Sequence, residues 1–208
     1  MRSKSGIKVV FVGSASVGKS CIFNYILKSE FDPNLEATLG SDTGIYNNPD
    51  LAEKDLLLTD TAGQEKYKSL LPIYFRGAVA AIIVYSIDIP ESLKYAEETY
   101  EEIIDANSIK IVYLVENKID LRNDEDYENK DELLSEEDGQ KLADKLGCHF
   151  MSVSAKTGHN IKILADEILL DCIKQDSPEE TDTIVLKDDQ ENKPNQKDSF
   201  FKKFSTKC

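Results

Sequence analysis

The chain has 208 residues, of which 40% are hydrophobic and 31% charged, and its formal net charge at pH 7 is −14. The length fits one domain of about 100–200 residues with a remainder, and the acidic balance argues against a nucleic-acid partner, which would need a basic surface. The four cysteines are too dispersed to indicate a disulfide framework or a zinc site, so a reducing cytosol fits best.

Short apolar runs alternate with amphipathic stretches up to about residue 175. The predicted strands are Ile7–Gly13, Asp55–Thr59, Val79–Ser86, Lys110–Glu116 and Cys148–Val153. The predicted helices are Lys19–Lys28, Glu91–Ala106, Ser135–Leu146 and Asn160–Lys174. Several strands are apolar throughout, as is typical of strands covered on both faces. The alternation predicts βαβ units and a mainly parallel sheet, in which ligands bind beyond the carboxyl ends of the strands.

Residues 176–208 differ in composition from the rest of the chain. They are rich in charged and amide side chains, contain Pro178 and Pro194, and offer few apolar groups. Such a segment does not bury enough surface to offset the entropy of ordering, so we expect a flexible tail. The sequence therefore predicts a domain over 1–175 followed by a tail over 176–208.

The segment from Gly13 to Ser20, GSASVGKS, matches the phosphate-binding pattern G-x-x-x-x-G-K-[ST]. It follows a predicted strand and opens a predicted helix, which is the context that the motif requires. Its backbone N–H groups and the positive helix end would face phosphate oxygens, Lys19 would reach the β- and γ-phosphates, and the Ser20 hydroxyl would be a Mg²⁺ ligand. The residues of this segment expected to contact the nucleotide are Ser14, Ala15, Ser16, Val17, Gly18, Lys19, Ser20 and Cys21.

Two further segments indicate which base is bound. Asn117, Lys118 and Asp120 come from the sequence NKID at the end of a predicted strand. The Asp120 carboxylate can accept hydrogen bonds from the ring N–H and the amine of guanine, whereas adenine offers neither donor there. The sequence Ser154-Ala155-Lys156, after the last predicted strand, would place a backbone N–H on the guanine carbonyl oxygen.

The sequence DTAGQE follows the second predicted strand. Asp60 would hold Mg²⁺ through water, and Gly63 would let a backbone N–H approach the γ-phosphate. Gln64 would orient the attacking water, which needs a neutral donor and acceptor rather than a strong base. A P-loop kinase or ATPase is disfavoured, because NKID and SAK would then have no role.

These four segments, in this order, resemble those of the Ras superfamily of small GTPases, and the stretch DTAGQEKYKSLLPIYFRGAVAAIIVYSIDIPESL resembles the Rab branch. The resemblance covers about residues 7–174. It implies a three-layer α/β fold of the P-loop NTPase type, with a six-stranded, mainly parallel sheet and helices on both faces. It also implies that Thr38 binds Mg²⁺ when the γ-phosphate is present and that Phe31 packs on the guanine ring.

The same resemblance implies a molecular switch that cycles between GTP and GDP and hydrolyses GTP slowly, with Gln64, Lys19 and Thr38 as its catalytic residues. The implied partners are an exchange factor, a GTPase-activating protein and effectors, and the implied process is vesicle trafficking. A Rho-like or divergent small GTPase, and a GTP-binding module with little hydrolysis, remain as alternatives.

Several positions depart from the Rab pattern. Ser16 replaces a common glycine, and Glu116 stands where a small residue often precedes NKxD. Thr43 and Thr59 occupy two of three positions that are usually aromatic, and Tyr74 occupies the third. The segment between Asp120 and Ser154 is long and carries an acidic run over 123–128, which we interpret as a solvated loop or a partner-binding insert.

Cys208 is the last residue of the sequence, so we expect no C-a-a-X box. Lysines and phenylalanines precede it, and one lipid chain together with a basic, aromatic patch is a common pair of anchoring signals. We expect prenylation of Cys208 and reversible attachment to the cytosolic face of endomembranes, with an unmodified terminus as the alternative.

Overall fold

The computed structural model describes residues 6–62, 71–106 and 109–176. They form one six-stranded sheet with the strand order β2-β3-β1-β4-β5-β6. The strands are β1 (Ile7–Val12), β2 (Ser41–Tyr46), β3 (Leu56–Thr61), β4 (Ala80–Ser86), β5 (Ile111–Asn117) and β6 (His149–Ser152). Only the β2–β3 pairing among them is antiparallel. The expected α/β fold with a mainly parallel sheet is confirmed.

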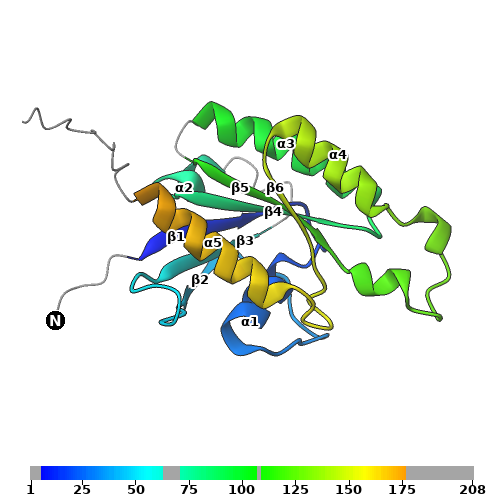
Figure 1. The fold of residues 1–208 in the computed structure, drawn as a ribbon. Helices are drawn as coiled ribbons and strands as arrows, with labels where there is room; N and C mark the ends of the chain where they lie inside the picture. The colour runs from blue at the N-terminus through cyan, green and yellow to red at the C-terminus, as the bar shows by residue number, and fades with distance from the viewer. Residues whose placement is uncertain (1–5, 63–70, 107–108, 177–208) are drawn as a thin grey trace, which may run out of the picture. The chain divides into compact units, whose positions relative to one another are not determined.

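Helices cover both faces of this sheet (Figure 1). They are α1 (Lys19–Lys28), α2 (Leu71–Phe75), α3 (Pro90–Ala106), α4 (Glu136–Leu146) and α5 (Ile161–Asp176), with short 3₁₀ helices η2 (Ile119–Arg122) and η3 (Lys130–Glu132). The helices α1 and α5 lie on one face, and α3 and α4 lie on the other. None of the helices in the described ranges is both long and apolar enough to cross a membrane.

Each face of the sheet has its own hydrophobic core, because successive side chains of a strand point to opposite faces. On β1, Val9 and Phe11 pack with α1 and α5, whereas Val10 and Val12 pack with α3 and α4. Every residue of β4 is buried, which explains why this strand is apolar along its length. The two cores fix the ends of β1, β3 and β5, where the predicted site residues lie.

The strand β2 and the helix α2 carry no clear signal in the residue pattern. The sequence of β2, SDTGIY, is largely exposed and lacks an apolar run. It becomes a strand by pairing with β3 in antiparallel register, from Ser41 opposite Thr61 to Tyr46 opposite Leu56. The other predicted elements have ends that differ from the observed ones by a few residues at most.

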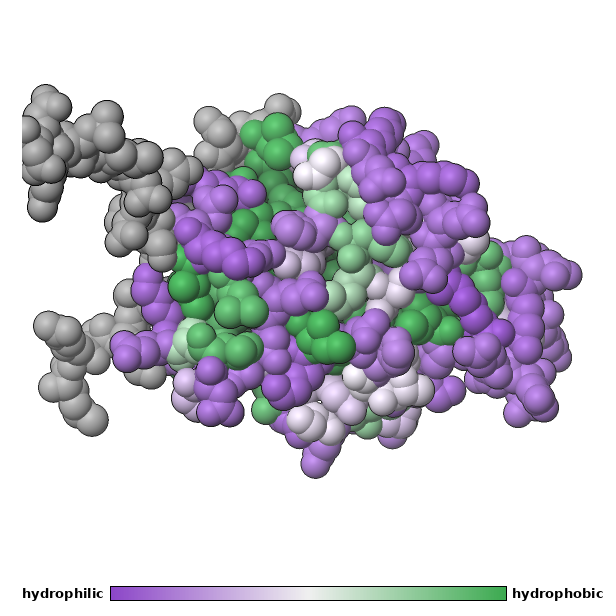
Figure 2. All heavy atoms as spheres, in the orientation of Figure 1, coloured by the Kyte–Doolittle hydropathy of each residue, from purple (hydrophilic) through white to green (hydrophobic). Residues whose placement is uncertain are grey.

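Hydrophilic side chains cover α3, α4 and the segment between β5 and α4 on the face shown in Figure 2. The helix α4 begins with a capping box, in which Ser135 accepts a hydrogen bond from the backbone N–H of Asp138 and the Asp138 carboxylate accepts one from the backbone N–H of Ser135. This exchange satisfies N–H groups that a helix start leaves without partners. The acidic run over 123–128 lies in the segment that precedes this cap.

Candidate functional site

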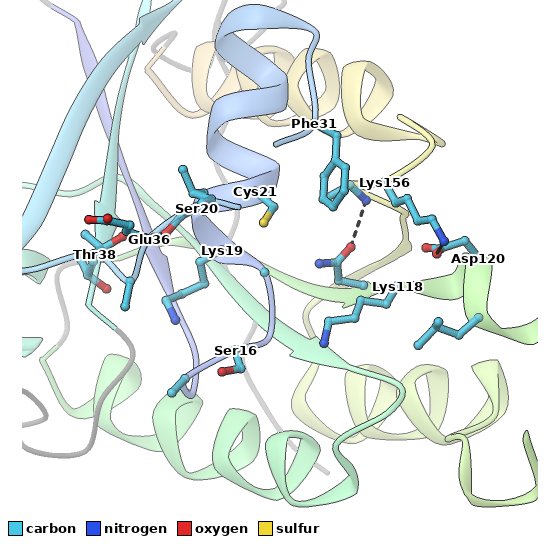
Figure 3. A pocket seen from close by; sticks show the side chains of 18 residues that line it. Ser16, Lys19, Ser20, Cys21, Phe31, Glu36, Thr38, Lys118, Asp120 and Lys156 are labelled. Carbon is cyan, nitrogen blue, oxygen red and sulfur yellow. Dashed lines mark hydrogen bonds and ion pairs between the residues drawn. The ribbon is translucent and has the colours of Figure 1, made fainter. Parts of the chain in front are cut away.

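A pocket of about 430 Å³ opens beside the ends of β1 and β5, between the loop before α1 and the loop before α5. Of the predicted site residues, it is lined by Ala15, Ser16, Gly18, Lys19, Ser20, Cys21, Phe31, Thr38, Asn117, Lys118, Asp120, Ala155 and Lys156. In Figure 3, Lys19, Ser20 and Thr38 lie toward one end of the pocket, and Lys118, Asp120 and Lys156 toward the other. The structure thus brings together residues from four distant segments.

The loop between β1 and α1 turns tightly enough to need unusual backbone angles. Gly13 and Gly18 have φ values of 142° and 92°. Ser16 also lies in the left-handed region, with φ of 63°, although it carries a side chain. Left-handed angles strain a side-chain-bearing residue by about 1–2 kcal/mol, which explains why glycine is common at this position.

The Lys19 ammonium lies under this loop. Its Nζ donates hydrogen bonds to the carbonyl oxygens of Gly13 at 3.0 Å and Ser14 at 2.7 Å. Burial lowers the pKa of Lys19 to about 8, while the charge of Asp60 acts in the opposite direction. A buried ammonium that has only carbonyl partners favours an anion nearby, so the environment of Lys19 suits phosphate oxygens.

Three oxygen-bearing side chains meet next to Lys19. The Ser20 hydroxyl donates to Oδ2 of Asp60 at 2.6 Å, the Thr38 hydroxyl donates to the same oxygen at 3.0 Å, and the two hydroxyl oxygens are 2.7 Å apart. The other carboxylate oxygen of Asp60, Oδ1, is buried and accepts no hydrogen bond from the described residues. Burial raises the pKa of Asp60, although its hydrogen bonds and Lys19 lower it.

These oxygens fit a magnesium ion. Mg²⁺ prefers hard oxygen ligands, keeps several waters, and is usually held by one or two protein groups together with phosphates. The unpartnered Oδ1 of Asp60 has the lone pairs that a metal-bound water would occupy, and the two hydroxyls supply neutral oxygens beside it.

Asn117 joins the loop before α1 to the loop before α5. Its Nδ2 donates to the carbonyl oxygen of Val17 at 2.8 Å, and its Oδ1 accepts from the backbone N–H of Ala155 at 3.1 Å. The contact is so close that a Cβ on Gly18 would lie 2.3 Å from Nδ2 of Asn117. Asn117 therefore connects two walls of the pocket through its side-chain hydrogen bonds.

Asp120 is held at the opposite end of the pocket from Lys19. The Ser154 hydroxyl donates to its Oδ1 at 2.5 Å, and Nζ of Lys156 lies 3.8 Å from its Oδ2. Lys156 also pairs with Asp124 at 3.5 Å. Ser154 lies behind the pocket wall and orients the carboxylate, and Oδ2 retains lone pairs for a ligand.

Phe31 and Lys118 complete the wall at this end. Phe31 is 37% exposed, which leaves its ring available to pack on a planar ligand. The Lys118 ammonium forms an ion pair with Asp88, at 2.9 Å from Oδ2. Residue patterns had not indicated five other lining residues. Thr61 and Leu121 adjoin predicted residues, and Leu35, Glu36 and Ala37 lie between Phe31 and Thr38 on a loop whose path has no sequence signal.

The remaining predicted residues lie elsewhere. Val17, Asp60 and Ser154 are buried behind the lining of the pocket, and Ser14 contributes its carbonyl oxygen to Lys19. Gly63, Gln64 and Cys208 lie outside the described residues.

Comparison with known proteins decides the family. The model of the Ras family matches residues 8–174, most of the chain. The chain belongs to the Ras family. As a member of this family of small GTPases, it is a GTP-binding switch protein that hydrolyses GTP to GDP. Ras-family proteins bind the guanine nucleotide together with Mg²⁺, in agreement with the donor set around Asp60.

Curated proteins that are similar to this chain include Rab and Ypt proteins. GTP-binding protein YPT52 of Saccharomyces cerevisiae is 35% identical over 185 residues, which cover 77% of this chain and 79% of the yeast protein. Ras-related protein Rab-34 of Rattus norvegicus is 36% identical over 158 residues, or 74% of this chain and 59% of the rat protein. Ras-related protein SEC4 of Candida albicans is 31% identical over 164 residues, covering 78% and 75%. The Ras-family GTPase described here is therefore Rab-like.

Proposed function

We propose that this Ras-family GTPase is a Rab-type switch in membrane trafficking, and that its nucleotide lies in the pocket described above. The observation that supports the nucleotide site most directly is the placement of Lys19 with Ser20, Thr38 and Asp60 at one end of the pocket and Asp120 at the other. The first group suits phosphates and a cation, and the second suits a base with two adjacent donors.

In this proposal each residue has a separate task. Lys19 binds the β- and γ-phosphates, and Phe31 packs on the base. The Asp120 carboxylate accepts from the ring N–H and the amine of guanine, while a backbone N–H of the segment 154–156 donates to the guanine carbonyl oxygen. Specificity follows because an adenine base would leave the partly buried Asp120 carboxylate without these donors.

Ser20, Thr38 and, through water, Asp60 would hold the magnesium ion. Bound Mg²⁺ would neutralise negative charge on the β- and γ-phosphates. Thr38 would engage only in the GTP form, which orders the segment around it, and loss of the γ-phosphate would release that segment. Gln64 would orient the attacking water, and Gly63 would donate its N–H to the γ-phosphate.

Large apolar side chains on the loop after Thr38, on β2 and on α2 are exposed, and we propose them as contacts for a protein partner. Leu39, which follows Thr38, is 81% exposed, and Ile45 on β2 is 62% exposed. Ile73 on α2 is 66% exposed. Protein partners commonly bind exposed apolar surface where it is contiguous, and the GTP-dependent ordering of Thr38 would make effector binding depend on the nucleotide. Because Thr43 and Thr59 replace usual aromatic residues, we expect effectors that differ from those of aromatic-triad Rabs.

Membrane attachment is proposed through a prenyl group on Cys208, aided by the lysines and phenylalanines that precede it. Membrane pelleting of the full chain from eukaryotic cells tests this. The parent should sediment with membranes, Cys208→Ser should remain in the supernatant, and intact mass should show an adduct on the parent only. A parent without an adduct would contradict the anchoring proposal.

Calorimetry with nucleotide-free protein and Mg²⁺ tests the nucleotide site. We expect GDP to bind at least about a hundredfold more tightly than ADP, and Asp120→Ala to remove most of this difference. Asp144→Ala on α4 is the matched control and should bind as the parent does. Equal binding of GDP and ADP by the parent would contradict the assignment.

A further inference from the structure

Glu116 is a fully buried carboxylate in β5, directly before Asn117. Arg122, at the end of η2, forms two parallel hydrogen bonds with it. Nη1 of Arg122 donates to Oε2 at 2.9 Å, and Nη2 donates to Oε1 at 2.8 Å. A planar guanidinium that binds both oxygens of a carboxylate fixes orientation as well as distance.

Further donors complete the network. The Tyr85 hydroxyl of β4 donates to Oε1 of Glu116 at 3.0 Å, and the Ser152 hydroxyl of β6 donates to Oε2 at 2.8 Å. Nη2 of Arg122 also donates to the carbonyl oxygen of Leu134, before α4. Each oxygen of Glu116 therefore has two donors, so the charge is tolerated away from water.

The helix α4 lies close over this network because it has a glycine there. A Cβ on Gly139 would lie 2.0 Å from the Tyr85 hydroxyl oxygen. Glycine within a helix lowers helix stability by about 1 kcal/mol relative to alanine. The chain thus has a residue that is unfavourable in a helix at position 139 of α4. A larger residue there would clash with the Tyr85 hydroxyl, which donates a hydrogen bond to Glu116.

The Glu116–Arg122 ion pair joins the two ends of the loop that carries the predicted base-binding residues. Glu116 precedes this loop, and Arg122 lies on the same short helix as Asp120, so the loop over 117–121 is held at both ends. Lys118 within it has a left-handed φ of 64°, an angle that the loop would relax from without a restraint. Ser152 connects the same carboxylate to the strand that leads to Ser154, the other partner of Asp120.

We propose that Glu116 and Arg122 are positioning residues for guanine selectivity: their ion pair holds the η2 turn so that the Asp120 carboxylate meets both donors of the guanine edge. The proposal rests on the proposed role of Asp120. An ion pair whose carboxylate is fully buried is a poor source of net stability, because desolvation of the charge offsets the attraction. Apolar side chains could fill the same space, but they would not fix the position of the loop as the Glu116–Arg122 ion pair does.

The test compares GDP with inosine diphosphate, which lacks the exocyclic amine and so reports on the second hydrogen bond to Asp120. The parent should bind GDP about tenfold or more tightly than inosine diphosphate. Arg122→Met should lower this ratio at least about threefold, because a displaced carboxylate no longer distinguishes the two bases. The Met side chain fills similar space but lacks the guanidinium fork.

A double variant separates positioning from stability. Arg122→Met alone leaves the Glu116 charge without a counterion, whereas Arg122→Met combined with Glu116→Gln removes both charges. We expect the double variant to recover most of the thermal stability but not the nucleotide ratio. Recovery of the ratio together with the melting temperature would overturn the proposal, because the pair would then serve stability alone.

Two controls keep the outcomes distinct. Lys145→Met breaks a surface ion pair with Glu97 on the helices α3 and α4, and it should leave the ratio unchanged. Asp120→Ala should bring the ratio close to one. If Asp120→Ala keeps the parent ratio, the proposed base contact itself is wrong. If Asp120→Ala abolishes the ratio while Arg122→Met keeps it, the base contact stands and the positioning role is refuted.

Discussion

Tyr46 on β2 donates a hydrogen bond of 2.5 Å to Oδ1 of Asp166 on α5, although 120 residues separate them. Asn48 donates to the same oxygen at 2.9 Å, and Lys162 donates to Oδ2 at 3.0 Å. The strand β2 lies at the edge of the sheet and follows the segment that contains Thr38. Asp166 thus fastens the edge strand to the helix that packs beneath the sheet.

We predict that Tyr46→Phe lowers the free energy of unfolding by about 1 kcal/mol, because it removes one hydrogen bond to a carboxylate. Urea unfolding at saturating GDP measures this change. Tyr127→Phe is the control, since the Tyr127 hydroxyl makes no recorded hydrogen bond within the described ranges. Equal stabilities of the parent and Tyr46→Phe would show that the bond contributes nothing.

The same bond predicts a pH dependence. Burial alone would raise the pKa of Asp166, but the hydrogen bonds from Tyr46, Asn48 and Lys162 lower it below its ordinary value. A carboxyl group with a lowered pKa in the folded state stabilises the fold above its unfolded pKa of about 3.9, and this contribution is lost as pH falls through the folded pKa. The stability difference between parent and Tyr46→Phe should therefore be largest near neutral pH and shrink below about pH 4.

The oxygen cluster around Asp60 predicts the effect of removing the metal. In the parent, chelation of Mg²⁺ should accelerate GDP release. In Asp60→Asn, release in excess Mg²⁺ should already be about 10–100-fold faster than in the parent, because the carboxylate that orients metal-bound water has lost its charge. A chelator should then add little. Stopped-flow release of a fluorescent GDP measures both rates.

Asp50→Asn provides the comparison for this experiment, since Asp50 is exposed in the loop between β2 and β3 and should keep the response of the parent. A full chelator response in Asp60→Asn would contradict the assignment of Asp60 to the metal site.

The left-handed angle of Ser16 predicts a stabilising substitution. Ser16→Gly should raise the free energy of unfolding by about 0.5–1 kcal/mol, since relief of backbone strain exceeds the entropy that glycine adds to the unfolded chain. Ala15→Gly, at a neighbouring position without a positive φ, should lower it instead. Urea unfolding of nucleotide-free protein separates these effects from ligand binding. A loss of stability in both variants would show that Ser16 is not strained.

Gln64 predicts the kinetic behaviour of the switch. Single-turnover hydrolysis by the parent should be slow, and a GTPase-activating protein should accelerate it about 10³–10⁵-fold. Gln64→Leu should hydrolyse GTP at least about tenfold more slowly, because leucine cannot orient water. Gln140→Leu on α4 should match the parent. Hydrolysis at the parental rate by Gln64→Leu would remove this residue from the mechanism.

Much of the fold could be predicted from the sequence because its central strands are buried on both faces. The runs that became β1, β4 and β5 are mostly apolar, and this pattern can be read from the sequence without knowledge of tertiary contacts. The strand β2 has no such pattern, because an exposed edge strand takes its structure from its neighbour β3. Its presence followed only from the family resemblance.

The site divides in the same way. Motif spacing indicated Lys19, Asn117 and Asp120, since each lies at a strand end or a helix start that the pattern marks. The family resemblance identified Glu116 as unusual but gave no partner for it. Its contact with Arg122 depends on the turn of η2, and its contact with Ser152 depends on the register of β5 with β6. Such contacts form between residues that are brought together by folding, so the local sequence gives no signal for them.

The close approach of Gly139 to Tyr85 restricts which substitutions this chain can accept at position 139. As long as Tyr85 serves the buried carboxylate, alanine at 139 would force α4 away from the sheet. In descendants that lose the acid at 116, alanine becomes favourable only where the side chains at both 85 and 150 are smaller, because a Cβ at 139 would also lie 2.6 Å from the Phe150 ring. Among relatives, the identities at 85, 116, 122, 139 and 150 should therefore be inherited as a set.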